Sequence, residues 1–257
     1  MHMSLKENYP EIEALTPEEI LEWTWNSFGE DAVFTSSFGA EDMVVIDMMA
    51  KKDVRIPIAT IDTGRLPEET YELMDRVASN YGVVIRSYFP EFGKVEEMVR
   101  NKGMNLFYKS VENRKLCCGI RKVEPLNRLL KGKKAWVTGL RADQTSFRQD
   151  AEVLELDSRR NLVKVNPILK LTSDEVWNYI RKNNVPYNSL HDQGYPSIGC
   201  APCTRAVKPG EGERAGRWWW ETDVKECGLH VKDSSSWGAA PEFRANNHES
   251  GSNGGGN

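Results

Sequence analysis

Five cysteines carry the clearest chemical signal in this 257-residue sequence. Cys117 and Cys118 are adjacent, Cys200 and Cys203 are two residues apart, and Cys227 stands alone. An odd, clustered set argues against a secreted disulfide scaffold, and the polar residues 1–7 contain no apolar export segment. The grouping instead indicates metal or thiol chemistry in a reducing compartment, which we expect to be the cytoplasm.

The two cysteine pairs together offer four soft thiolate ligands, enough for a zinc ion or an iron–sulfur cluster. Adjacent ligands are awkward for zinc, because neighbouring side chains diverge and must both bend onto one small ion. A [4Fe–4S] cluster offers separate iron atoms that adjacent thiolates can reach individually. We therefore expect such a cluster on Cys117, Cys118, Cys200 and Cys203. The alternatives are zinc, or an inert adjacent pair with only Cys200 and Cys203 acting together.

Cys227 is the thiol left over, in the segment ECGLH that also contains His230. A thiol beside cations or a histidine ionises more readily, and the thiolate is the nucleophile. We interpret Cys227 as a reactive cysteine. The alternative is an ordinary small core residue.

Cations and a glycine-containing loop indicate a site for a polyanion. Lys122 follows Cys118 by one helical turn, and arginine matches phosphate and sulfate geometry in two-point fashion. The loop of residues 36–42, with Ser36, Ser37 and Gly39, leads into an expected helix whose first N–H groups can bind an anion. A solvated surface and a simple tight turn are the alternatives. The arginines considered are Arg141, Arg148, Arg205, Arg214 and Arg217.

These groups need a scaffold, and the hydrophobic pattern predicts an α/β fold. Strands are expected at residues 32–36, 56–61, 83–88 and 135–139, alternating with helices at 41–51, 67–80, 95–102 and 116–130. Such alternation implies a mostly parallel sheet with helices on both faces, whose ligands bind at the carboxyl ends of the strands. Residues 36–40, 62–65 and 139–148 occupy that position. The last of these helices would carry Cys117 and Cys118 in its first turn.

The later part of the chain reads differently. Residues 152–156 and 162–165 predict a β-hairpin, and residues 173–183 a helix capped by Thr172 or Ser173. Residues 191–231 are loop-like. We expect one domain over residues 1–231 and a flexible low-complexity tail over 232–257.

Composition excludes two classes of protein. The net charge of -4 argues against a dedicated nucleic-acid binder. No apolar run approaches the roughly 18 residues that a membrane span needs. The hydrophobic share of 39% is ordinary for a soluble globular enzyme.

Seven motifs, taken together, resemble the adenylyl-sulfate (APS) reductase branch of the APS/PAPS reductase family, assimilatory iron–sulfur type. PAPS is the 3′-phosphorylated form of APS. ECGLH combined with the two cysteine pairs is the most specific part of the resemblance. The motifs are SSFGAED (36–42), IDTGRLPEETY (61–71), CCGIRKVEPL (117–126), GLRADQTSFRQ (139–149), CAPCTR (200–205), ERAGRWWWE (213–221) and ECGLH (226–230).

The resemblance implies an adenine-nucleotide α-hydrolase-like fold, related to the ATP pyrophosphatases, with a loop-rich C-terminal segment. It implies that the cysteine pairs hold a [4Fe–4S] cluster and that Cys227 attacks the sulfur of APS, leaving an S-sulfocysteine and AMP. It places cationic groups around the phosphosulfate: Lys122, Arg141, Arg148, Arg214, Arg217 and His230. It places the adenosine and ribose on Ser36, Ser37, Gly39, Ile61, Thr63, Gly64 and Gly139.

Electron counting adds a partner. Reduction to sulfite takes two electrons, and Cys227 is the one thiol outside the expected cluster, so a second thiol must come from elsewhere. Thioredoxin or glutaredoxin is the expected donor, in sulfate assimilation and cysteine biosynthesis. The cluster would act through its charge environment, with Lys122 between it and the substrate. A homo-oligomer is compatible with this interpretation.

Three other functions compete. A PAPS reductase, or an enzyme of dual specificity, is the nearest. A tRNA-thiolating enzyme of the ATP pyrophosphatase type should show a Ser-Gly-Gly-x-Asp-Ser loop and a basic face, and this sequence shows neither. A zinc-binding interaction module is the third.

Overall fold

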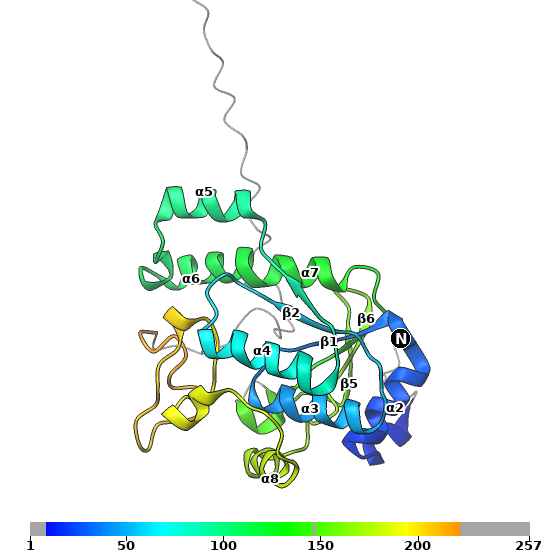
Figure 1. Ribbon diagram of the computed structural model, residues 1–257. Helices are drawn as coiled ribbons and strands as arrows, with labels where there is room; N and C mark the ends of the chain where they lie inside the picture. Colours follow the sequence, from blue (N-terminus) through cyan, green and yellow to red (C-terminus); the bar gives the residue numbers. More distant parts are fainter. Residues whose placement is uncertain (1–8, 146–147, 222–257) are drawn as a thin grey trace, which may run out of the picture.

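A six-stranded sheet forms the centre of the computed structural model, which describes residues 9–145 and 148–221 (Figure 1). The strand order is β3-β2-β1-β4-β6-β5, and only the pairing of β5 with β6 is antiparallel. This confirms the predicted α/β class, the mostly parallel sheet and the hairpin. The strands are β1 (Ala32–Thr35), β2 (Ile58–Ile61), β3 (Ile85–Tyr88), β4 (Ala135–Val137), β5 (Leu154–Asp157) and β6 (Leu162–Val165).

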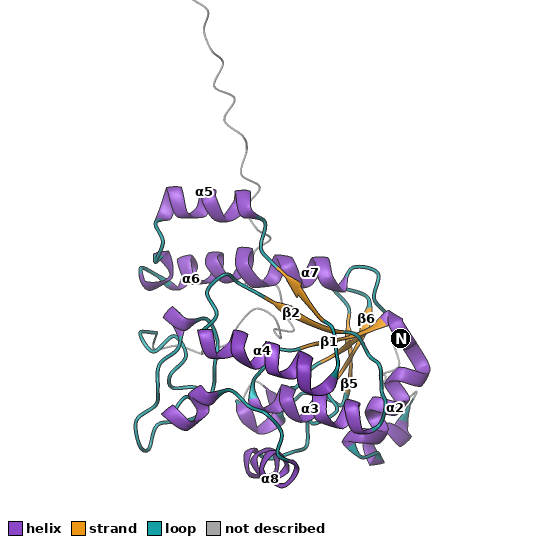
Figure 2. Cartoon of the chain, in the orientation of Figure 1, coloured by secondary structure: helices purple, strands orange, loops and turns teal. Residues whose placement is uncertain are grey.

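Helices cover both faces of the sheet (Figure 2). Strand residues alternate between the two faces, as strand geometry requires. Ala32 and Phe34 pack into a core with residues of α2, α3, α4 and α8, whereas Val33 and Trp136 pack with Leu126 and its neighbours on α7. The sheet is therefore the middle of three layers. The helices are α2 (Pro17–Phe28), α3 (Ala40–Lys51), α4 (Glu68–Tyr81), α5 (Phe92–Lys102), α6 (Val111–Cys118), α7 (Glu124–Leu130) and α8 (Ser173–Asn183).

The helix of the adjacent cysteines differs from the prediction. It begins at Val111, because the Ser110 side chain caps it by accepting a hydrogen bond from the Asn113 backbone N–H. Cys117 and Cys118 therefore end α6 instead of opening a helix, and a π-helical turn (Gly119–Val123) separates them from α7. Pro125 has no N–H to give to the carbonyl four residues earlier, and such a wide turn accommodates that loss.

Capping boxes mark the starts of two helices. Helix α2 was not predicted from the sequence, although Thr16 and Glu19 form a complete capping box at its start. Thr172 caps α8 in the same way, as predicted. The predicted domain boundary near residue 231 lies outside the described residues and stays a prediction. Across residues 9–145 and 148–221, none of the helices has the length and apolar character that crossing a bilayer requires.

Candidate functional site

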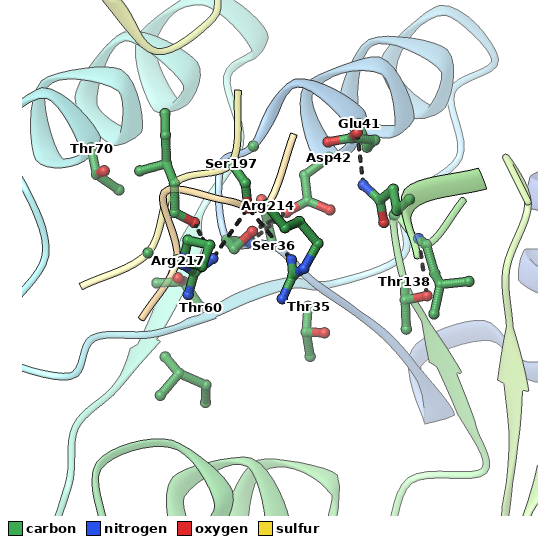
Figure 3. Close-up of a pocket in the computed structure, with 18 of the residues that line it drawn as sticks. Thr35, Ser36, Glu41, Asp42, Thr60, Thr70, Thr138, Ser197, Arg214 and Arg217 are labelled. Carbon is green, nitrogen blue, oxygen red and sulfur yellow. Dashed lines mark hydrogen bonds between the residues drawn. The ribbon is translucent and has the colours of Figure 1, made fainter. Parts of the chain in front are cut away.

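A cavity opens at the carboxyl ends of β1, β2 and β4, where the alternating pattern predicted a binding site. Ser36 and Ser37 reach it from the loop after β1, Ile61 from β2 and Gly139 from the loop after β4. Residues 196–199 and 213–217 close it from the C-terminal part of the described chain. Figure 3 shows Arg214 and Arg217 entering from this side, near Ser36 and Asp42.

The loop after β1 is held by a carboxylate. Asp42 accepts hydrogen bonds from the backbone N–H of Ser37 at 2.6 Å and from its hydroxyl at 2.9 Å. The Ser36 hydroxyl accepts from the backbone N–H of Phe38, which has a left-handed φ of 58°. Burial raises the pKa of Asp42 to about 6, against the opposing effect of its hydrogen bonds from Ser37. The loop therefore contains a carboxyl group that titrates in the mildly acidic range.

Gly139 is fitted against this carboxylate. A Cβ at position 139 would overlap the Asp42 carboxylate and would lie 3.2 Å from the Asp42 backbone nitrogen. Only glycine therefore allows the loop after β4 to approach the start of α3 this closely.

Two arginines meet on one serine at the C-terminal wall. Arg214 and Arg217 each donate to the Ser197 hydroxyl, at 3.4 and 3.3 Å, and Arg217 also donates to the Ile198 carbonyl at 3.1 Å. A Cβ at Gly199 would overlap the Arg217 guanidinium. Two positive charges that meet on one hydroxyl suit an anion.

Arg141 lies deeper than the resemblance implied. Its guanidinium is buried and donates to Glu41 at 3.0 Å, to Glu213 at 3.3 Å and to Asp143. It is absent from the cavity lining, whereas Arg148 belongs to it and donates to Gln144. In this structure Arg141 joins the first loop to the C-terminal wall.

A second, smaller cavity beside the first is lined by four free cysteines, Cys117, Cys118, Cys200 and Cys203. The same cavity is lined by four cationic side chains, those of Arg65, Arg114, Arg121 and Lys122. Among the described residues, no carboxylate lines it. Thr63 Oγ1 lies 3.2 Å from Cys200 Sγ. Burial raises the pKa of Cys118, and raises that of Cys203 to about 12, so these sulfurs would be thiolates near neutral pH only with a cation bound to them.

The four cysteines are donors of the type that iron–sulfur clusters use, and a cluster on them stays a prediction. Four sulfur ligands with surrounding cations match a group that is anionic once four thiolates bind it. Within the described ranges, no three side chains of the types His, Cys, Asp and Glu are close enough to serve as ligands of one metal ion.

Lys122 connects the two cavities, because its side chain lines both. Its charge also acts on the Cys118 thiol, which it favours in the ionised form. The predicted place of Lys122 between a cluster and the substrate stays a prediction.

Most predicted binding residues lie around the first cavity, but not all of them. Thr63 and Gly64 turn toward the cysteines and Arg121 instead, since Arg121 donates to the Thr63 carbonyl at 2.6 Å. Cys227 and His230 lie outside the described residues, and their roles stay predictions. The cavity lining includes Ser36, Ser37, Gly39, Ile61, Lys122, Gly139, Arg148, Arg214 and Arg217.

Some residues of the cavity lining were not predicted from the sequence. Glu41 and Asp42 belong to the motif SSFGAED, and an acidic pair in the first turn of a helix could have indicated their position at the site. Ser197 and His191 gave none, because nothing in their local sequence marks them as cavity residues.

Comparison with known proteins adds independent information. Residues 31–206 match the family described as phosphoadenosine phosphosulfate reductase domain. The adenosine 5′-phosphosulfate reductase of Allochromatium vinosum is 50% identical over 205 residues, covering 79% of this chain and 80% of the relative. The enzyme of the same name from Burkholderia cepacia is 49% identical over 227 residues, covering 85% of this chain and 91% of the relative.

Solved structures agree on the fold. A phosphoadenylyl-sulfate reductase from Candida auris, crystallised with phosphate, superposes with a TM-score of 0.68 at 30% identity, over 80% of this chain and 99% of that one. The FMN adenylyltransferase of Candida glabrata superposes with a TM-score of 0.52 at 15% identity, over 79% of this chain and 70% of that one, which shows a shared fold alone.

Proposed function

Since the chain belongs to the phosphoadenosine phosphosulfate reductase family, we propose that it reduces adenylyl sulfate to sulfite and AMP in sulfate assimilation. The observation that carries this proposal is the pair of adjoining cavities. One combines a serine- and glycine-containing loop with arginines, the other is lined by four cysteines, and Lys122 belongs to both.

The positive charges of the first cavity support this proposal. Arg214 and Arg217, which both donate to the Ser197 hydroxyl, attract the negative charge of a phosphosulfate. Lys122 adds a third positive charge on the side of the cysteines. The loop of Ser36 and Ser37 at the start of α3 supplies backbone N–H groups at the sheet edge. The same charges stabilise AMP as the leaving group.

The chemical step belongs to Cys227. Its thiolate attacks the sulfur of adenylyl sulfate, the bond between that sulfur and the phosphate oxygen breaks, and AMP leaves with the oxygen. The enzyme then carries Cys227 as an S-sulfocysteine. An external dithiol attacks the Cys227 sulfur, sulfite leaves with the bonding pair, and the second donor thiol resolves the mixed disulfide. The dithiol thus loses two electrons, and the sulfur released as sulfite has gained them.

We assign Cys117, Cys118, Cys200 and Cys203 as ligands of a [4Fe–4S] cluster. Bound there, the cluster would shape the charge around the substrate site without donating electrons. Lys122 is the residue of this chain that would transmit that influence, because it lines both cavities. Zinc is the alternative occupant, and iron and sulfide analysis of the purified protein distinguishes the two.

The remaining partners follow from the chemistry. Thioredoxin or glutaredoxin is the proposed donor of the external thiols, and the reducing cytoplasm is the proposed compartment. PAPS is the second candidate substrate, since the similar Candida auris protein is a phosphoadenylyl-sulfate reductase.

A single-turnover trap tests the function. Anaerobic protein is mixed with sulfur-labelled APS or PAPS without a thiol donor, and protein-bound label is counted after denaturation. We expect label from APS and its release as sulfite by thioredoxin. Label from PAPS alone moves the assignment to PAPS reductase, and label from both indicates dual specificity. No label from either, with the protein intact, contradicts the proposal.

A further inference from the structure

His191 is a cavity residue with no role in the function described so far. It lies in a short 3-10 helix (Ser189–Gln193) and lines the first cavity together with Glu41 and Ser37. Its ring packs edge-on against Trp177 of α8, with 5.1 Å between ring centroids, and Tyr187 lies 6.4 Å away. The imidazole is therefore fixed in place by aromatic neighbours at the edge of the binding site.

The polar atoms of this ring have no partner among the described residues. Both Nδ1 and Nε2 are shielded from solvent and make no hydrogen bond there, although the Tyr195 backbone lies nearby. A buried polar atom without a hydrogen bond is costly, and native proteins rarely contain one. Because the residue lines the cavity, a ligand bound there is the partner within reach of this ring.

Burial favours the neutral form of the ring, which has carboxylates near it. Burial lowers the pKa of His191 below its ordinary value, outweighing the opposite effects of Glu41, the Tyr195 backbone and Asp192. A neutral imidazole offers one N–H donor and one nitrogen acceptor. The carboxylates of Glu41 and Asp192 disfavour an anion beside the ring, so the phosphosulfate belongs with the arginines and the uncharged part of the substrate with His191.

We propose that His191 is a substrate-contacting residue that hydrogen-bonds to the adenosine part of the bound nucleotide. The proposal rests on the proposed function, because it takes the occupant of the cavity to be an adenine nucleotide. It assigns the missing partner of the ring to a polar group of the base edge or to a ribose hydroxyl. His191 would then contribute to nucleotide selection without touching the sulfur.

The test measures nucleotide binding, not turnover, with holoprotein purified anaerobically. The probes are AMP, inosine monophosphate and 2′-deoxy-AMP, titrated by calorimetry into wild-type protein and into His191→Phe, which keeps an aromatic ring against Trp177. His191→Asn, which keeps a donor and an acceptor, is the second variant. Tyr187→Phe is the matched control, because Tyr187 packs against the same tryptophan and its hydroxyl donates to Asp192 outside the cavity.

We expect His191→Phe to weaken AMP binding by about ten- to a hundred-fold, with His191→Asn between it and the wild type. Tyr187→Phe should bind AMP as the wild type does. The wild type should prefer AMP over one analogue by about ten-fold, and His191→Phe should lose that preference. Loss against inosine monophosphate places the contact on the base, and loss against 2′-deoxy-AMP on the ribose.

Two results overturn the proposal. Equal affinity of His191→Phe and wild type for AMP shows that the ring makes no contact, and weakened binding with both preferences intact shows that the contact is not to the nucleoside. If the wild type binds none of the probes, nor APS, the proposed function fails, and this inference fails with it. A folded His191→Asn variant keeps the test valid should His191→Phe not fold.

Discussion

Arg114 and Glu221 form a buried two-point ion pair, with nitrogen–oxygen distances of 2.9 and 2.8 Å, between the helix of the adjacent cysteines and the last described residue. The Arg114 guanidinium also lies 4.8 Å from the centroid of the Trp218 ring. Glu221 precedes the proposed nucleophile, Cys227, by six residues. The ion pair therefore holds the chain in place six residues before Cys227. Six residues span at most about 20 Å, so this anchor limits where Cys227 can reach.

Glu221→Gln should destabilise the protein strongly. Breaking a buried pair removes the carboxylate charge that faces Arg114 and costs about 3–5 kcal/mol, which lowers the melting midpoint by roughly 6–20 °C in a chain of this size. Scanning calorimetry of the purified protein measures the shift. Glu22→Gln is the matched control, since its pair with Lys52 is exposed and is worth about 0–1 kcal/mol. Equal midpoints for the two variants would contradict this account of the pair.

Gly139→Ala should impair nucleotide binding. The added Cβ overlaps the Asp42 carboxylate, so Asp42 must move and release the Ser37 backbone that it holds. We expect AMP affinity to fall at least about ten-fold and stability to fall by about 1–3 kcal/mol. Gly93→Ala is the control, because a Cβ there meets no atom within 4 Å and position 93 is helical. It should be neutral or slightly stabilising.

The sequence allowed the fold and much of the first cavity to be predicted, for a physical reason. Alternating strands and helices determine which loops meet at one sheet edge, and Ser36, Ile61 and Gly139 follow from that topology alone. The prediction that Cys117 and Cys118 lie in the first turn of a helix was wrong. The helix start was missed because the cap at Ser110 is a weaker sequence signal than the apolar pattern.

Other features depend on tertiary contacts that no local pattern reveals. Arg141 looked like a substrate ligand in its loop, but in the fold Glu41 and Glu213 reach it from distant segments and join the neighbouring Asp143. His191 lines the cavity and packs against Trp177 of α8, which is distant from the other cavity walls in the sequence. Neither contact has a sequence signature, since the partners are brought together by folding.

The free energy of unfolding should depend on pH through the titration of Asp42. Because the folded pKa is raised to about 6, the folded state binds this proton more tightly than the unfolded chain does. The resulting stabilisation is complete below about pH 4 and is lost as the pH rises through about 6, a change of about 3 kcal/mol.

Urea unfolding of wild type and Asp42→Asn between pH 4 and 7 checks this. The asparagine cannot titrate, so the wild type should lose stability relative to the variant as the pH rises. Ser37→Ala, which keeps the carboxyl group, should retain the pH dependence. A constant difference between wild type and Asp42→Asn across this range would show that the carboxyl does not titrate there.

Cys203→Ser and Cys227→Ser should separate the two kinds of cysteine. Cys203 is buried in the four-cysteine cavity, so its serine variant should lose iron, sulfide, visible absorbance and activity together. Cys227→Ser should keep the cluster and bind AMP as the wild type does, yet form no protein-bound sulfur label from APS, because the attacking thiolate is gone. Metal analysis and the single-turnover trap measure both sets of properties on the same preparations. Iron and sulfide at wild-type levels in Cys203→Ser would mean that the ligand set is misassigned. Sulfite release by Cys227→Ser at the wild-type rate would remove Cys227 from the mechanism while leaving the cluster assignment standing.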